Sequence, residues 1–116
     1  MREITVINQA TGKPISSRIS VAESSFSRFI GLMGKKSLAA DRGLLIRPSA
    51  GVHTFWMRFP IDVVALDKRL RVVGLWPNLR PFRLSGISFK IHSVLELPAG
   101  HIALCKISIG DQMQEC

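Results

Sequence analysis

The chain has 116 residues, 47% of them hydrophobic, and carries 16 Lys and Arg against eight Asp and Glu. A chain of this length predicts one domain, residues 1–116, whose core needs neither disulfides nor metal. The composition excludes a disordered protein, and no apolar run approaches the roughly 18 residues of a transmembrane segment. The formal net charge of +8 favours an anionic partner: nucleic acid, anionic lipid, another anionic ligand or an acidic protein.

The first seven residues contain a single Arg and then alternate polar and apolar side chains, as a strand does. They contain neither the apolar block nor the cleavage site of a signal peptide, so a cytoplasmic location is expected. Cys105 and Cys116 are the only cysteines, and no Cys-x-x-Cys spacing occurs. Free thiols are therefore expected, with no metal and no cofactor.

Residues 3–8 and 15–21 alternate polar and apolar side chains, and the turn-forming residues 11–14 lie between them. This pattern predicts a β-hairpin with a short loop. The period then changes to that of a helix with one apolar face, made of Phe26, Phe29, Ile30 and Met33. Ser24 or Ser25 is suited to the N-cap of this helix, and Gly34 to its C-terminal end.

Short strands are expected at residues 44–47 and 52–57. Residues 61–66 are apolar on both faces apart from Asp62, which is typical of a central strand. A turn at residues 67–69 joins this strand to the next one, residues 70–76, and so forms a second hairpin.

Residues 77–91 combine turn-forming residues with scattered large apolar side chains, which is typical of a binding loop or lid. A strand at 92–97, a turn at 98–100 and a short helix at 102–107 are expected to follow. The chain is then expected to end in a turn and an edge strand near residues 109–113.

These elements predict a mainly β (α+β) fold, with one amphipathic helix near residues 24–33. The seven to eight short strands would form a small, mostly antiparallel barrel or rolled sheet.

A series of short motifs follows in a fixed order along the chain: Gly31-Leu32-Met33, Gly43-Leu44-Leu45, Phe55-Trp56-Met57, Pro60-Ile61-Asp62, Val94-Leu95-Glu96-Leu97, Ala99-Gly100 and Gly110-Asp111. The series resembles the prokaryotic family catalogued as domain of unknown function 192, from about residue 20 onward. Many members read Phe-Trp-Met-Lys-Asn-Thr before the proline, where this chain has Arg58-Phe59. The resemblance implies a compact, mainly β fold and no established activity.

Residues 53–67, HTFWMRFPIDVVALD, place polar side chains among core residues of two adjacent predicted strands. Buried polar groups need partners, so the segment is either a structural network or the wall of a pocket. Asp62 can reach back to Arg58 across the turn at Pro60, in an ion pair that fixes the turn. The alternative is that Arg58 clamps an anionic group against the ring of Trp56, with Asp62 orienting it.

Other polar residues have simpler interpretations. His53 is a candidate base or ligand, but His92 and His101 do not stand at metal-binding spacing. Glu96 is expected to be exposed or paired with a basic residue. Arg80 and Arg83 lie near large aromatic residues and could form a cationic stacking surface.

The leading hypothesis is a non-enzymatic ligand-binding or accessory module, with its site where residues 53–62 meet the 77–91 loop. One alternative is a nucleic-acid-binding protein that acts through basic loop residues. Another is a small hydrolase or lyase that uses Asp62 and His53. Known catalytic motifs are absent from the sequence, which lowers the expectation of an enzyme. The candidate ligand-binding residues are His53, Trp56, Arg58, Asp62, Arg80 and Arg83.

Overall fold

The computed structural model of the protein describes residues 2–30, 32, 35–55 and 57–116. Four residues named above, Gly31, Met33, Gly34 and Trp56, lie outside this part of the chain, as do the side chains of Phe26, Phe29 and Ile30.

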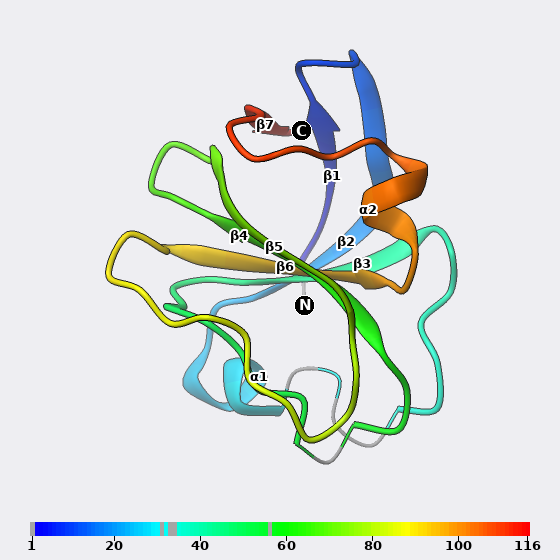
Figure 1. Ribbon diagram of the computed structural model, residues 1–116, viewed down its shortest axis with the longest axis vertical. Helices are drawn as coiled ribbons and strands as arrows, with labels where there is room; N and C mark the ends of the chain where they lie inside the picture. Colours follow the sequence, from blue (N-terminus) through cyan, green and yellow to red (C-terminus); the bar gives the residue numbers. More distant parts are fainter. Residues whose placement is uncertain (1, 31, 33–34, 56) are drawn as a thin grey trace.

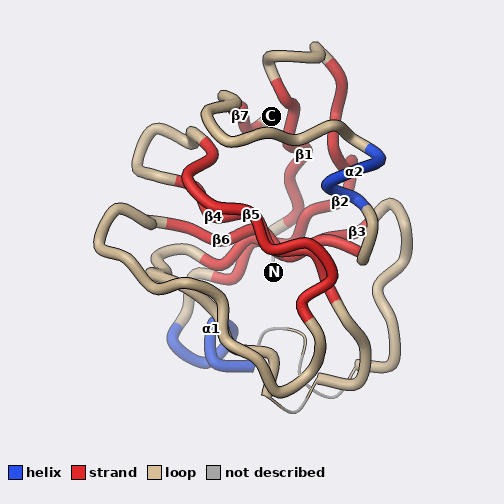
Figure 2. The backbone as a smooth tube through the Cα atoms, in the orientation of Figure 1, coloured by secondary structure: helices blue, strands red, loops and turns tan. Residues whose placement is uncertain are grey.

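Seven strands form a single curled sheet in the order β5-β4-β6-β3-β2-β1-β7 (Figures 1 and 2). Neighbouring strands pair antiparallel, except that β2 and β3 pair parallel. The predicted mainly β, rolled-sheet fold is therefore confirmed. The strands are β1 Glu3–Asn8, β2 Lys13–Ala22, β3 Arg42–Ile46, β4 Ile61–Leu66, β5 Val72–Leu79, β6 Ser93–Pro98 and β7 Met113–Glu115.

The two edge strands of the sheet approach each other at the start of β5. The N–H of Val72 donates to the carbonyl of Asp111 at 2.9 Å, and the N–H of Met113 donates to the carbonyl of Leu70 at 2.9 Å. These bonds satisfy backbone groups that an open edge would leave unpaired, and they draw the sheet into a half-barrel.

Two buried apolar clusters cover opposite faces of this sheet. Successive side chains of a strand point to opposite faces. Accordingly, Leu95 on β6 and Val64 on β4 belong to the first cluster, whereas Val94 and Val63 belong to the second. The first cluster includes Ile102 from the second helix, and the second receives side chains from the segments around β4 and β5.

The two helices are short. A side-chain cap marks the start of the first, and a left-handed residue marks the end of the second. Helix α1, Ser25–Ile30, is capped by Ser24, whose Oγ accepts the N–H of Ser27 at 3.0 Å. Helix α2, His101–Leu104, stops before the expected residue 107 because Lys106 adopts a left-handed conformation with φ of 53°. The N–H of Ile107 then donates back to the carbonyl of Ile102 at 3.0 Å, as in a Schellman motif.

The predicted strand at residues 52–57 is wrong. Among the described residues of this segment, 52–55 and 57, only His53 makes a β-bridge, and its partner is Leu84 from the 77–91 loop, not a strand of the sheet. The segment therefore pairs with an irregular loop and does not add a strand to the sheet.

Candidate functional site

The site lies where residues 51–55 pair with residues 82–86, at the end of the molecule near α1 (Figure 1). The N–H of Thr54 donates to the carbonyl of Arg83 at 2.8 Å, and the N–H of Phe82 donates to the carbonyl of Thr54 at 3.0 Å. One step further, the N–H of Ser85 donates to the carbonyl of Val52 at 2.9 Å. The two segments predicted to form the site therefore meet directly.

Thr54 fixes the geometry of this junction. Its side chain is fully buried, and its Oγ1 donates to the carbonyl of Arg80 at 2.5 Å. The same oxygen accepts the backbone N–H of Arg83 at 2.9 Å. One hydroxyl group thus holds the backbone of two of the three predicted ligand-binding arginines, Arg80 and Arg83, while their side chains extend into solvent.

Three rings lie in a row beside these arginines. The imidazole of His53 stacks on the ring of Phe55 with centroids 5.3 Å apart, and Phe55 lies 6.3 Å from the ring of Phe82. Phe55 and Phe82 are 38% and 54% exposed, so an aromatic surface is open to solvent.

The charged residues that lie near the rings in the sequence, within residues 53–58 and 80–83, are all arginines. Arg58, Arg80 and Arg83 are exposed, and none of the salt bridges within the described residues involves them. The sequence from Lys68 to Leu95 contains six Lys and Arg and no Asp or Glu. We call this surface, made of His53, Phe55, Arg58, Arg80, Phe82 and Arg83, the arginine–aromatic face.

Asp62 is part of the framework and does not belong to this face. Its side chain is fully buried, with Oδ1 accepting the N–H of Asn78 at 2.8 Å and Oδ2 accepting the N–H of Ile102 at 2.7 Å. The expected ion pair with Arg58 is not formed, because both oxygens are used by backbone donors on β5 and α2. Those donors were invisible in the sequence, since they come from residues 16 and 40 positions away.

Glu96 also differs from its expected environment. It is 2% exposed, and its Oε1 has no hydrogen-bond partner. Burial raises the pKa of this carboxyl from 4.5 to about 8. The expectation of an exposed or paired side chain was therefore wrong: its alternation with Leu95 and Leu97 placed Glu96 on the other face of a strand that is buried on both sides.

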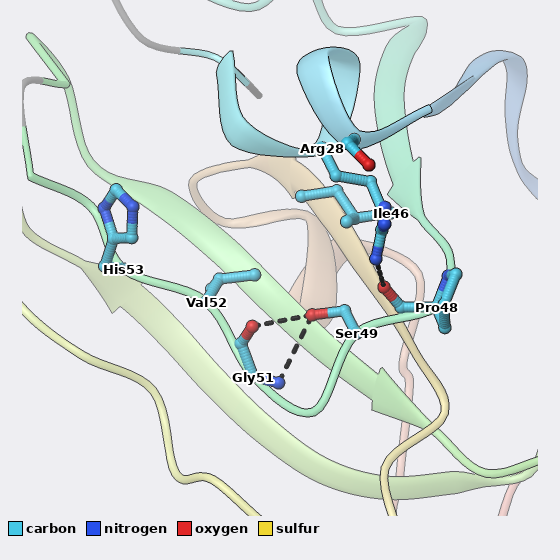
Figure 3. A pocket seen from close by; sticks show the side chains of 8 residues that line it. Arg28, Ile46, Pro48, Ser49, Gly51, Val52 and His53 are labelled. Carbon is cyan, nitrogen blue, oxygen red and sulfur yellow. Dashed lines mark hydrogen bonds between the residues drawn. The ribbon is translucent and has the colours of Figure 1, made fainter. Parts of the chain in front are cut away.

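A cavity of about 410 Å³ adjoins the face and is lined in part by His53 (Figure 3). Arg28, in the wall of this cavity, was not predicted from the sequence, because a single Arg within a short helix carries no distinguishing signal. Arg28 donates to the carbonyl of Pro48 at 3.1 Å, and Ser49 donates to the carbonyl of Gly51 at 2.6 Å. Arg28 and Ser49 thus each donate to a backbone carbonyl of the wall, and His53 lies away from them in Figure 3.

The remaining predicted groups do not converge. Within the described residues, no three His, Cys, Asp or Glu side chains are grouped as metal ligands. Cys105 and Cys116 are free thiols, as expected, and burial raises the pKa of Cys105. None of the helices described is long and apolar enough to cross a membrane.

The fold defines a small, basic β half-barrel protein, and sequence comparison gives its family. Residues 6–115 match the model of DUF192, described as "Uncharacterized ACR". The chain therefore belongs to this family, as its motifs suggested. It is 31% identical to a UPF0127 protein of Thermococcus sibiricus, covering 93% of this chain and 72% of that protein. A UPF0127 protein of Pyrococcus furiosus is also 31% identical, covering 94% and 96% of the two chains.

Two crystal structures share the fold. A protein of unknown function from Novosphingobium aromaticivorans has a TM-score of 0.82 and 23% identity, over 97% of this chain and 83% of that one. A Sinorhizobium meliloti protein, named provisionally as a transcription regulator, has a TM-score of 0.83 and 22% identity, over 97% and 92% of the two chains. At these identities the likeness establishes the fold alone.

Proposed function

We propose that this protein is a non-enzymatic binding module that takes an anionic partner at the arginine–aromatic face. The observation that carries the proposal is the combination of exposed arginines, exposed rings and an acid-free sequence on a backbone fixed by Thr54. A guanidinium group binds phosphate or carboxylate in a bidentate manner, and the neighbouring rings supply contact area. Fixing the backbone in advance lowers the entropy cost of binding.

The roles of the individual residues follow from their positions. Arg80 and Arg83 contact the anionic groups, while His53, Phe55 and Phe82 contact the flat or apolar part of the partner. Arg58 adds a further charge, and the role of Trp56 as contact area stays a prediction. Asp62 has no direct role, because its side chain is enclosed. The cytoplasmic location also stays a prediction from the sequence.

A single-stranded nucleic acid is the second candidate partner, favoured by the neighbouring rings of Phe55 and Phe82. Bases stack on such rings while arginines contact the phosphates. A hydrolase or lyase is less well supported, because the carboxyl group that it needs is buried and already accepts two hydrogen bonds.

Affinity for immobilised heparin, a generic polyanion, tests the proposal. The test variant is Arg80→Gln/Arg83→Gln, and the matched control is Lys13→Gln/Lys106→Gln. The control removes the same charge from a different cavity, between β2 and the end of α2. We expect the test variant to elute at clearly lower salt than the control, because its two charges act at the binding face.

Equal shifts for the two variants would contradict the proposal and reduce the net charge to a general surface property. A titration with a single-stranded oligonucleotide, followed by amide NMR, then distinguishes the second candidate. Saturable shifts at residues 80–90 that survive physiological salt would make nucleic acid the partner.

A further inference from the structure

Three large apolar side chains protrude from the loop that follows β5. Leu84 is 57% exposed, Ile87 is 72% exposed and Phe89 is 94% exposed. A single exposed apolar residue needs no explanation, but several within six residues mark a surface that contacts an apolar phase. Because these side chains stand out from the surface, they suit a partner into which they can insert.

The backbone of this loop is held in place. The N–H of Ser88 donates to the carbonyl of Ala50 at 3.2 Å, and the N–H of Ile91 donates to the carbonyl of Ser88 at 3.1 Å. Gly86 lies against the ring of Trp76, where an added Cβ would come within 2.7 Å of Cζ2. Hydrogen bonds and packing on both sides therefore fix the backbone around Ile87 and Phe89 while their side chains stay exposed.

We propose that residues 82–90, here called the docking loop, insert their apolar side chains into the interface of an anionic lipid bilayer. The inference rests on the proposed function and deepens it by naming the class of partner. The cations flanking the apolar side chains, Arg80, Arg83 and Lys90, meet the negatively charged headgroups. Burial of apolar surface and attraction to anionic lipid together give stable binding, as they do for other proteins at membrane interfaces.

Charge and chemistry separate this partner from two others. A second copy of the chain would bring the same cationic surface against itself in a symmetric dimer, and like charges repel. Nucleic acid offers phosphates and base faces but no apolar phase for Leu84 and Ile87, which cannot stack. A fluid hydrocarbon interface accepts protruding aliphatic and aromatic side chains without a complementary groove.

Co-sedimentation with vesicles tests the proposal. The wild-type protein is mixed with vesicles of phosphatidylcholine alone, or of phosphatidylcholine and phosphatidylserine in equal parts. The test variant is Ile87→Ser/Phe89→Ser. The matched control, Leu104→Ser/Ile109→Ser, removes two apolar side chains that are 74% and 61% exposed in the chain segment after β6.

We expect the wild-type protein and the control variant to bind the anionic vesicles far better than the neutral ones. The test variant should bind the anionic vesicles about tenfold more weakly, because two apolar side chains no longer insert. Arg80→Gln/Arg83→Gln should weaken binding about 25-fold, at roughly fivefold per charge.

Other results overturn the inference in distinguishable ways. Heparin binding through Arg80 and Arg83 without vesicle binding would reject the membrane and leave the proposed function standing. If replacing Arg80 and Arg83 weakens binding neither to heparin nor to the anionic vesicles, both the membrane inference and the proposed function are rejected. Vesicle binding that depends on the arginines but not on Ile87 and Phe89 would show adsorption by charge without insertion. A wild-type dimer that the test variant dissociates, measured by light scattering, would assign the loop to contact between copies.

Discussion

The two faces of the sheet each bury one carboxyl group, and the two groups have opposite surroundings. Asp62 on β4 pairs across the ladder with Leu97 of the first cluster, and both of its oxygens accept backbone N–H groups. Glu96 on β6 pairs with Val63 of the second cluster, and its Oε1 accepts none. Two acidic residues with similar burial therefore have different consequences for the fold.

The difference shows what a buried carboxyl group needs. Asp62 joins the start of α2 and the far part of β5 to the central strand, so its desolvation is offset by two charge-assisted hydrogen bonds. Glu96 lacks such donors, so its charged form is disfavoured and the raised pKa keeps it protonated near neutral pH. The second face is also the one that packs against Val52, Trp76 and Leu79, next to the segments of the arginine–aromatic face.

The largest expected effect is a loss of stability through Glu96 as the pH rises. The folded-state pKa of about 8 lies above the usual 4.5, so the folded protein holds a proton that the unfolded chain releases. The contribution of Glu96 to the free energy of unfolding is therefore fully present below pH 4.5. It decreases between pH 4.5 and about 8 and stays constant above that range. The total loss is roughly 3–5 kcal/mol, at about 1.4 kcal/mol for each pH unit.

Glu96→Gln isolates this contribution, because Gln has nearly the same shape and does not ionise. The free energy of unfolding in urea, measured for both proteins across this pH range, should favour the variant increasingly as the pH rises. Parallel curves for the two proteins would mean that Glu96 does not titrate between the two pKa values, and the contrast with Asp62 would fail.

Asp62→Asn should produce the next largest effect, a loss of about 2–3 kcal/mol in the free energy of unfolding. An amide can accept one of the two backbone N–H groups, but its own NH₂ group would face the other donor. The matched control is Asp67→Asn. There a single oxygen, Oδ1, accepts the N–H groups of both Arg69 and Arg71, so an Asn side chain can replace it with little loss. Equal denaturation midpoints for Asp62→Asn and Asp67→Asn would show that Asp62 is not a structural anchor.

This contrast also shows what the sequence could predict. The strands at β1, β2, β4 and β6 carry clear patterns: alternation in a half-buried hairpin, or continuous apolar runs in central strands. Local patterns also predicted a helix cap at Ser24 or Ser25, of which Ser24 is the cap, and a turn at residues 67–69. These features depend on neighbours within a few positions, so the sequence contains the necessary information.

The site was only partly predictable, because its contacts join residues that are far apart in the sequence. The meeting of the segment 53–62 with the 77–91 loop was expected, but the pairing of His53 with Leu84 had no local signature. The partners of Asp62 and the isolation of Glu96 depend on which strands become neighbours. Sequence spacing could suggest a nearby partner such as Arg58 but could not reveal backbone donors brought in by the fold.

Thr54→Val should have a smaller effect on stability, about 1–2 kcal/mol, but a clear effect on the site. The change keeps the side-chain shape and leaves the carbonyl of Arg80 and the N–H of Arg83 without their partner. Amide hydrogen exchange at residues 82–85 should become faster, and affinity for heparin should fall. Thr54→Ser retains the hydroxyl group and is the control. Unchanged exchange in Thr54→Val would indicate that the backbone pairing alone holds the arginine–aromatic face.

Ser93→Ala should have the smallest effect, a gain below about 1 kcal/mol. Ser93 is fully buried, its Oγ has no hydrogen-bond partner, and it pairs with Leu66 on the same face as Asp62. Like Glu96, it therefore carries an unsatisfied oxygen, but a hydroxyl group does not ionise and its desolvation costs less. The gain should be constant with pH, whereas the gain from Glu96→Gln should grow as the pH rises. If the gain in the free energy of unfolding of Ser93→Ala depended on pH, the hydroxyl group would be coupled to a titrating group. The ionisation of buried groups would then affect both faces of the sheet, not only the face of Glu96.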